Sequence, residues 1–159
     1  YEKGIPMGGE LNAKKDAPPS FLFAAMKDPR GANLDRLQIV KGWIEKEEMK
    51  EKVFNVAWSD ERPVDEEGNI TPVGNTVNLE EATWTDTIGN AALLGIWSDP
   101  EHDPSKAAVY YARVLQIPTP RWTLYDKVRF GIKDMDEEIP LVTQERAYSS
   151  PIWYKPKKN

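Results

Sequence analysis

Few side chains in this sequence are of the types that carry out catalysis or bind metals, and only one of them is a histidine. His102 lies between acidic residues in the run Asp99-Pro-Glu-His-Asp103, and the 159 residues include no cysteine. Without cysteine there is no disulfide, thiolate zinc site or cysteine nucleophile. Neighbouring residues on one turn cannot all converge on a metal, and no second histidine stands at ligand spacing. We therefore interpret His102 as part of a turn, and predict no catalytic residue and no metal ligand in this chain.

A second group of potential ligands is acidic and lies in the Gly- and Pro-rich stretch 60–75. Its carboxylates are those of Asp60, Glu61, Asp65, Glu66 and Glu67. Calcium prefers oxygen ligands, but these residues lack the alternating order of a calcium-binding loop. The stretch is therefore interpreted as a solvated loop.

Charged side chains also gather at two other places where they could face a partner. Asp28, Asn33 and Arg36 lie in and just after the turn Asp28-Pro-Arg-Gly31, and Glu145 and Arg146 lie near the end of the chain. Such groups either pair across the fold to fix loops or line a cleft against another domain. We take these five residues as the candidate binding residues.

The overall charge excludes several kinds of partner. There are 26 acidic and 21 basic residues, which gives a net charge of -5. This balance argues against a nucleic-acid partner, and no apolar run is long enough to span a membrane. The basic residues Lys155, Lys157 and Lys158 are interpreted as a solvated tail.

The six tryptophans raise the alternative of a carbohydrate-binding surface. Trp43, Trp58 and Trp97 share the apolar parity of their expected strands, so core packing is the default for them. Trp84 and Trp122 are less determined. These two rings are the candidates for stacking on a sugar.

The elements that must position these residues are mainly β-strands. Period-two alternation and turn residues predict strands at 20–27, 34–44, 51–59, 82–88, 91–98, 107–117 and 141–147. The uninterrupted apolar run 20–27 is typical of a strand buried on both faces, and Gly89-Asn90 predicts a tight hairpin. One short helix is expected at about 120–130, capped by Thr119 and ended before Gly131.

These elements favour a mostly β fold, an antiparallel immunoglobulin- or fibronectin-like β-sandwich with one short helix. Tyr110 resembles the tyrosine of such sandwiches whose hydroxyl bonds back to the preceding corner. We expect an extended lead-in at 1–19, the sandwich domain at 20–154 and a basic tail at 155–159. Because the chain begins with Tyr1, we expect that a leader was removed or that it is a piece of a longer protein.

Several long strings resemble a known family. They are 4–9 (GIPMGG), 27–43 (KDPRGANLDRLQIVKGW), 72–77 (PVGNTV), 117–123 (IPTPRWT) and 144–154 (QERAYSSPIWY). Together they look like the C-terminal part of domain-of-unknown-function family 3604. The likeness covers nearly the whole chain.

The resemblance implies a longer bacterial protein, exported or periplasmic, whose N-terminal region is similar to the PHP superfamily of metal-dependent phosphoesterases. A divalent metal would lie in that region, because its early His-x-His motif has no counterpart here. The expected function is thus a non-catalytic accessory domain that packs on the metal-bearing region of the same polypeptide and walls its cleft. Two alternatives remain, a free-standing carbohydrate-binding module and a purely structural interaction domain.

Overall fold

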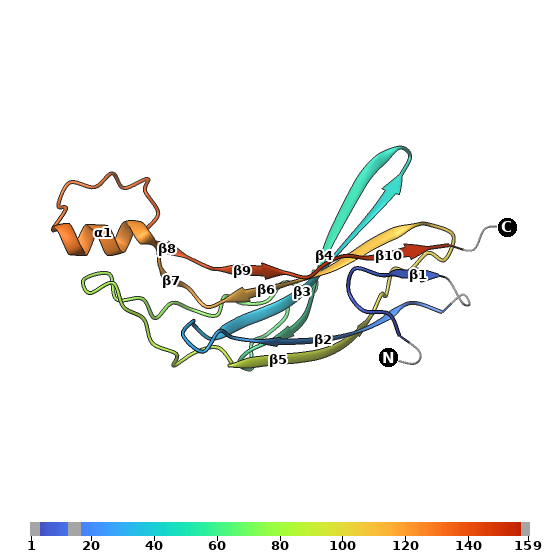
Figure 1. The fold of residues 1–159 in the computed structure, drawn as a ribbon, viewed down its shortest axis with the longest axis horizontal. Coiled ribbons are helices and arrows are strands. Elements are labelled where there is room, and N and C mark those ends of the chain that lie inside the picture. Colours follow the sequence, from blue (N-terminus) through green and yellow to red (C-terminus); the bar gives the residue numbers. More distant parts are fainter. Residues whose placement is uncertain (1–3, 13–16, 157–159) are drawn as a thin grey trace.

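The computed structural model describes residues 4–12 and 17–156 and shows two β layers with an arm projecting from one end (Figure 1). The large sheet has the order β1-β10-β6-β3-β4, and β9 also pairs with β6. The small sheet contains β2 and β5. The bounds in the large sheet are β1 Glu10–Asn12, β3 Leu34–Glu45, β4 Glu48–Trp58, β6 Ala108–Gln116, β9 Arg146–Tyr148 and β10 Ile152–Lys155, and in the small sheet β2 Ser20–Met26 and β5 Ala92–Ser98. The expected mostly β sandwich with one helix is confirmed.

The core lies between the two layers and is centred on β3. This strand has β4 on one side and β6 on the other, and its residues Leu37 and Ile39 are almost fully buried. Phe21 of β2 contacts Tyr110 of β6 with ring centroids 4.8 Å apart. Trp97 packs half-buried against the same cluster, which agrees with its expected core role.

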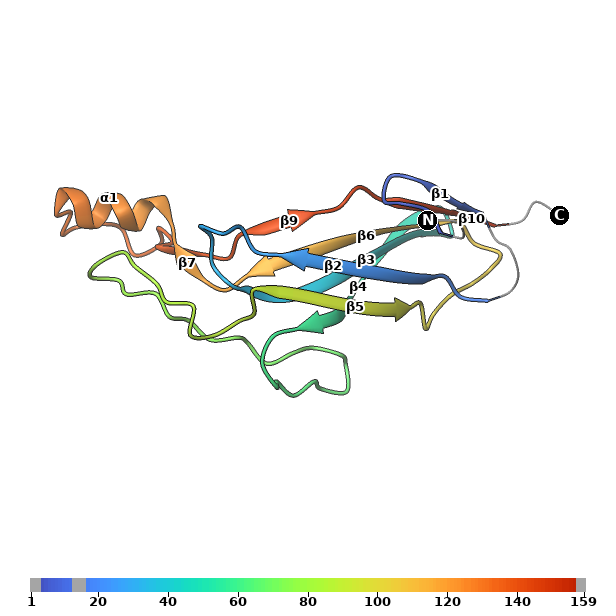
Figure 2. The same cartoon turned by 60° about the horizontal axis from the view of Figure 1, so that its bottom comes forward.

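Strand β2 is buried on one face only, which corrects the expectation for 20–27. Phe21 points into the core, whereas Leu22 and Met26 are 72% and 83% exposed. In Figure 2, β2 and β5 lie in front of the large sheet, and no helix or strand covers their outer side. The strand that is buried on both faces is β3, because β2 and β5 cover one side of it and polar networks fill the other.

The strand expected at 82–88 does not form, and Gly89-Asn90 is not a hairpin turn. Leu34 and Asn90 exchange two backbone hydrogen bonds of 2.8 and 3.0 Å, so Asn90 pairs with the start of β3. The side-chain amide of Asn33 also donates to the carbonyl oxygens of Ile88 and Gly89. These bonds occupy the backbone that a hairpin would need, and β5 pairs with β2 instead.

The arm consists of β7 (Thr119–Pro120), α1 (Trp122–Phe130) and β8 (Val142–Thr143), with a loop at 131–141. The expected helix is confirmed, and Gly131 ends it in the left-handed conformation with φ 63°. The expected cap is wrong, because Thr119 lies in β7 and Arg121 occupies the N-cap without a side-chain hydrogen bond. The strand expected at 141–147 is divided into β8 and β9.

Two pairings shape the end of the molecule opposite the arm (Figure 1). β1 runs parallel to β10, with Glu10 beside Trp153, and Lys155 forms an ion pair of 2.6 Å with Glu10. Lys157 and Lys158 of the expected basic tail lie outside the described residues. The β3–β4 hairpin turns on Lys46 and Glu47, both at positive φ, and its tip projects from the body.

Candidate functional site

A hollow of about 650 Å³ opens at the base of the arm. Arg121, Gln144, Glu145 and Arg146 line it, together with Asn75 from the long loop before β5. Among the described residues, neither Arg121 nor Arg146 has a carboxylate partner. Guanidinium groups in this state can bind a carboxylate, a phosphate or an acidic side chain of another surface.

Backbone hydrogen bonds fix the two sides of this hollow. The Arg121 N–H donates to the Leu141 carbonyl at 2.9 Å, which closes the base of the arm. The Gln116 N–H donates to the Glu145 carbonyl at 3.0 Å, at the point where β9 joins β6. The chain before β9 is thereby held against the end of the large sheet, so that Gln144 to Arg146 lie along one side of the hollow.

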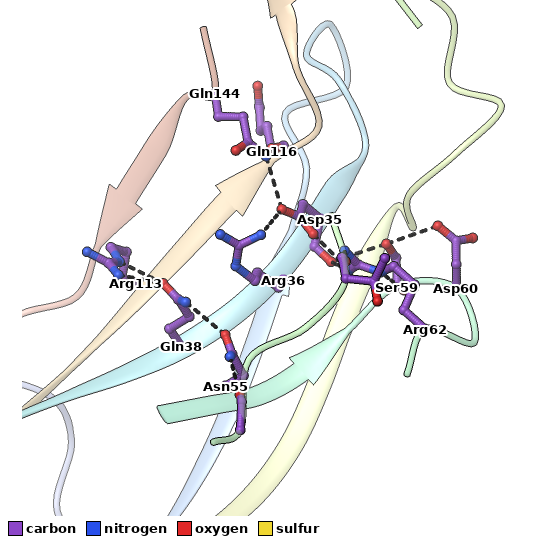
Figure 3. Close-up of polar contacts among 12 residues, drawn as sticks. Asp35, Arg36, Gln38, Asn55, Ser59, Asp60, Arg62, Arg113, Gln116 and Gln144 are labelled. Carbon is purple, nitrogen blue, oxygen red and sulfur yellow. Dashed lines mark hydrogen bonds and ion pairs between the residues drawn. The ribbon is translucent and has the colours of Figure 1, made fainter. Parts of the chain in front are cut away.

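Gln144 connects the hollow to a buried carboxylate (Figure 3). Its amide nitrogen donates to Asp35 Oδ2 at 3.0 Å and to the Gln116 carbonyl at 2.9 Å. Asp35 is fully buried near the start of β3. The side chain of Gln144 is therefore held by the sheet beneath it.

Two arginines neutralise Asp35. Arg62 Nη2 lies 2.7 Å from Oδ1, and Arg36 Nη1 lies 2.5 Å from Oδ2. Arg62 also donates to the carbonyl oxygens of Ser59 and Thr71, both at 3.0 Å. Asp35 and Arg62 thus tie the loop after β4 to β3, and a buried charge of this kind needs such partners.

A second polar relay crosses β6, β3 and β4 on the same side of the large sheet (Figure 3). Arg113 donates to Gln38 Oε1 from Nε at 2.9 Å and from Nη2 at 2.6 Å. Gln38 in turn donates to Asn55 Oδ1 at 2.8 Å. Each amide is oriented by its neighbour, so this relay stiffens the sheet beside the hollow.

The structure divides the five candidate residues into two groups. Glu145 and Arg146 line the hollow, and Arg36 reaches it indirectly through Asp35 and Gln144. Asn33 is buried and its backbone N–H donates to Asp86 Oδ1 at 2.9 Å, while Asp28 accepts a hydrogen bond from the Arg30 N–H within its own turn. Asn33 and Asp28 therefore fix loops.

Sequence reasoning missed Arg121, Gln144 and Arg62. The first two approach one another only because the arm returns to the sheet at β8. Arg62 lies in the acidic stretch 60–75, and its bonds to Asp35 and Ser59 show that this part of the stretch is anchored to the sheet and is not a fully solvated loop. One signal was available, since Asp35 lies beside apolar Leu34 in a strand expected to be half-buried, and a buried charge requires a partner.

Another polar cluster lies near the opposite end of β3, beside a smaller hollow of about 160 Å³. Asp99 Oδ2 accepts the Tyr110 hydroxyl at 2.7 Å and pairs with Lys41 Nζ at 2.6 Å. Tyr110 thus bonds back to the preceding corner, as the sequence predicts. Burial alone would raise the pKa of Asp99, but the hydrogen bonds from Lys41 and Tyr110 outweigh it and lower that pKa.

Burial has the largest influence on the pKa of Tyr110 and on the pKa of the nearby His102. It raises the pKa of Tyr110, and the hydrogen bond to Asp99 adds to the effect. It lowers the pKa of His102, whose ring meets the edge of Tyr154 at a centroid distance of 4.8 Å. His102 is thus a packed, neutral ring at neutral pH. A tyrosine held protonated and a lysine paired with a carboxylate are suited to structural support.

The described residues contain no group of three or more histidines and carboxylates placed to hold a metal ion. None of the helices they form is long and apolar enough to cross a membrane. In the acidic stretch, Asp65 accepts the Asn69 N–H at 2.7 Å and closes a turn. The guanidinium groups of Arg121 and Arg146 in the hollow are suited to bind an anionic or acidic group.

The comparisons with known proteins agree with the resemblance seen in the sequence. The family described as "Protein of unknown function (DUF3604)" matches residues 1–156. No curated protein and no solved structure matches the chain. Because the match covers nearly the whole sequence, the chain belongs to the DUF3604 family.

Proposed function

We propose that this chain is a non-catalytic accessory domain of a larger PHP-like metal-dependent hydrolase. In this proposal it packs on the metal-bearing region of the same polypeptide and forms one edge of its cleft with the hollow at the base of the arm. The observation that carries the proposal is the arm itself, which presents exposed aromatic side chains beside two arginines that have no carboxylate partner among the described residues.

Helix α1 exposes most of its apolar side chains. Trp122 and Phe130 are 64% and 67% exposed, whereas the helix buries only Thr123 and Leu124. Figure 1 shows the arm extending beyond both sheets, so no other described element covers its far side. Clustered apolar groups on a projecting element are typical of a contact surface.

The hollow beside this helix supplies the polar part of the proposed edge. Arg121 and Arg146 would face the cleft, with Glu145 between the arm and the sheet. Arg36 would act as a positioning residue, because it holds Asp35 and through it Gln144. Asp28 and Asn33 would keep the neighbouring loops in place.

The described residues of this chain do not fit the divalent metal that a PHP-like hydrolase implies. The described carboxylates and His102 do not converge, and the buried carboxylates Asp35 and Asp99 already have cationic partners. The metal is therefore assigned to the region of the polypeptide outside this chain. The contribution of this chain is limited to packing and to shaping the cleft.

The proposal is tested by hydrolysis of generic phosphoesters in the presence of divalent metals. The isolated chain is expected to show no metal-dependent turnover, and such turnover would refute its accessory role. In the longer polypeptide, Arg146→Ala is expected to raise KM by a larger factor than the factor by which it changes kcat. Arg30→Ala, in the exposed turn 28–31, is the matched control and should leave both constants unchanged. Equal KM values for the two variants would contradict a cleft edge at the hollow.

One observation favours the carbohydrate-binding alternative, namely the exposed ring of Trp122. Trp84 is half-buried, which makes it the weaker platform. Titration of the isolated chain with oligosaccharides, followed by tryptophan fluorescence, separates the two functions. A saturable change that Trp122→Ala abolishes would support sugar binding, and a flat titration would remove that alternative.

A purely structural role is the remaining alternative. It predicts that the arm is protected from solvent in the longer polypeptide while Arg121→Ala and Arg146→Ala both leave turnover unchanged. The kinetic comparison above therefore distinguishes it from a cleft edge.

A further inference from the structure

The outer face of the small sheet is apolar from Leu22 to Met26 and carries a pair of serines at one end. The cross-strand pairs on this face are Ser20 with Ser98, Leu22 with Ile96, Ala24 with Leu94, and Met26 with Ala92. It carries no charged side chain. Its four large residues, Leu22, Met26, Leu94 and Ile96, are 71 to 83% exposed. We name these eight residues the β2–β5 face.

The sequence of β2 is typical of a strand that is covered on both sides. The inward residues Phe21 and Phe23 pack on the core, while the outward residues are Leu22, Ala24 and Met26. Strands with one solvated face alternate apolar and polar residues, and strands that read as continuous apolar runs are covered on both faces. The pattern of β2 therefore indicates a third layer, which the described residues do not provide.

We propose that the β2–β5 face docks on an apolar surface of the polypeptide to which this chain is proposed to belong, making the chain the outer part of a three-layer arrangement. This inference rests on the proposed function for the existence of that polypeptide. It goes further by naming the interface, which lies on a different part of the molecule from the arm and the hollow.

The area of the face decides between this partner and a second copy of the chain. Two paired strands of seven residues cover about 23 Å by about 10 Å. If two such faces packed together, they would bury less than about 1,000 Å² in total, even when the uneven side-chain surface roughly doubles the area of each flat face. Stable complexes between separate proteins bury about 1,200–2,000 Å², so the face is too small for a stable dimer. A covalently attached partner needs less, because tethering gives an effective concentration in the millimolar range.

The lack of charge on the face defines the chemistry of its partner. A charged side chain placed against Leu94 or Ile96 would lose its hydration without gaining an ion pair. The docking surface is thus expected to be an apolar helix or sheet face without Lys, Arg, Asp or Glu at its centre.

Methionine oxidation provides a direct test, because the chain contains a matched pair of exposed methionines. Met26 lies on the β2–β5 face and Met49 lies at the tip of the β3–β4 hairpin, with exposures of 83% and 85%. In the isolated chain, peroxide should oxidise the two at similar rates, as followed by peptide mass spectrometry. In the longer polypeptide, the oxidation of Met26 should slow at least tenfold relative to its rate in the isolated chain.

The variant Leu94→Lys completes the test. It changes a side chain that is 71% exposed, so the isolated chain should keep its fold and its near-ultraviolet circular dichroism. In the longer polypeptide it should restore the fast oxidation of Met26. Thr87→Lys, in the exposed part of the preceding loop, is the control and should leave Met26 protected.

Two results would overturn the proposal. The first is unslowed oxidation of Met26 in the longer polypeptide. The second is a stable dimer of the isolated chain in sedimentation velocity that Leu94→Lys dissociates, since the face would then bind a second copy. Failure of the proposed function has a different signature, because it would leave Met26 protected while Arg146→Ala has no effect on KM.

Discussion

The ion pair between Asp35 and Arg62 offers the sharpest test of how the site is held together. The carboxylate side chain is fully buried and that of Arg62 is 9% exposed. Removing one partner of a buried pair costs about 3–5 kcal/mol, because the remaining charge is left in a poorly solvated place. Arg36 remains on Oδ2 at 2.5 Å and reduces this cost. We expect Arg62→Met to lower the free energy of unfolding by about 3 kcal/mol.

The matched control is Lys50→Met, which breaks the ion pair of Lys50 with Glu48 at the projecting hairpin. These side chains are 43% and 71% exposed, so the expected change is below about 0.5 kcal/mol. Urea unfolding of the 159-residue chain, followed by tryptophan fluorescence, measures both.

The double variant Asp35→Asn/Arg62→Met tests whether charge is the cause. It removes both members of the pair, so its cost should fall short of the sum of the single variants by at least about 1 kcal/mol. An Arg62→Met effect as small as that of Lys50→Met would refute the reasoning. So would strict additivity, since it would mean that the two side chains contribute independently.

Three further predictions concern the backbone and the pH dependence of stability. Gly89 has φ +77°, and a Cβ there would lie 2.7 Å from the side chain of Ile117. Gly68 also has a positive φ, but the space around it is open, so Gly68→Ala should lower the free energy of unfolding by roughly 1 kcal/mol and Gly89→Ala by well over that amount. Thermal unfolding of both variants checks this. The pKa of Asp99 is lowered in the fold, so its contribution is present above its ordinary pKa near ~3.9 and is lost as the pH falls through the lower folded value. Urea unfolding between pH 2.5 and 6 should therefore give a shallower acid loss for Asp99→Asn, and an unchanged slope would contradict the linkage. The pKa of His102 is also lowered, so stability should begin to fall as the pH drops below about 6.5, and His102→Gln should remove that part of the slope.

Local patterns were sufficient to predict the long elements. β3 and β6 are strands close to the expected ranges, and α1 ends at Gly131 because glycine accepts the left-handed conformation there. The segment 82–88 was misjudged because its backbone bonds to residues far away in the chain, including Asn33. Such long-range partners leave no trace in a short window of sequence.

The candidate site could also be predicted only in part, because some of its residues come together through long-range contacts. Glu145 and Arg146 stood out as charged residues before a final strand, and the structure places both in the hollow. Arg121 could not be assigned, because its position depends on how the arm returns to β8. The exposure of one face of β2 could not be predicted either, because an uninterrupted apolar run is typical of a strand that is buried on both faces.

The parallel pairing of β1 with β10 affects how the chain is made. Trp153 is synthesised about ten seconds after its partner Glu10 at ordinary elongation rates. During that interval the β3–β4 hairpin can form, but β1 has no strand to join and the central sheet lacks that edge. Final assembly of the sheet thus requires that β10 has been synthesised, and nascent chains stopped before β10 should remain sensitive to proteases and available to chaperones.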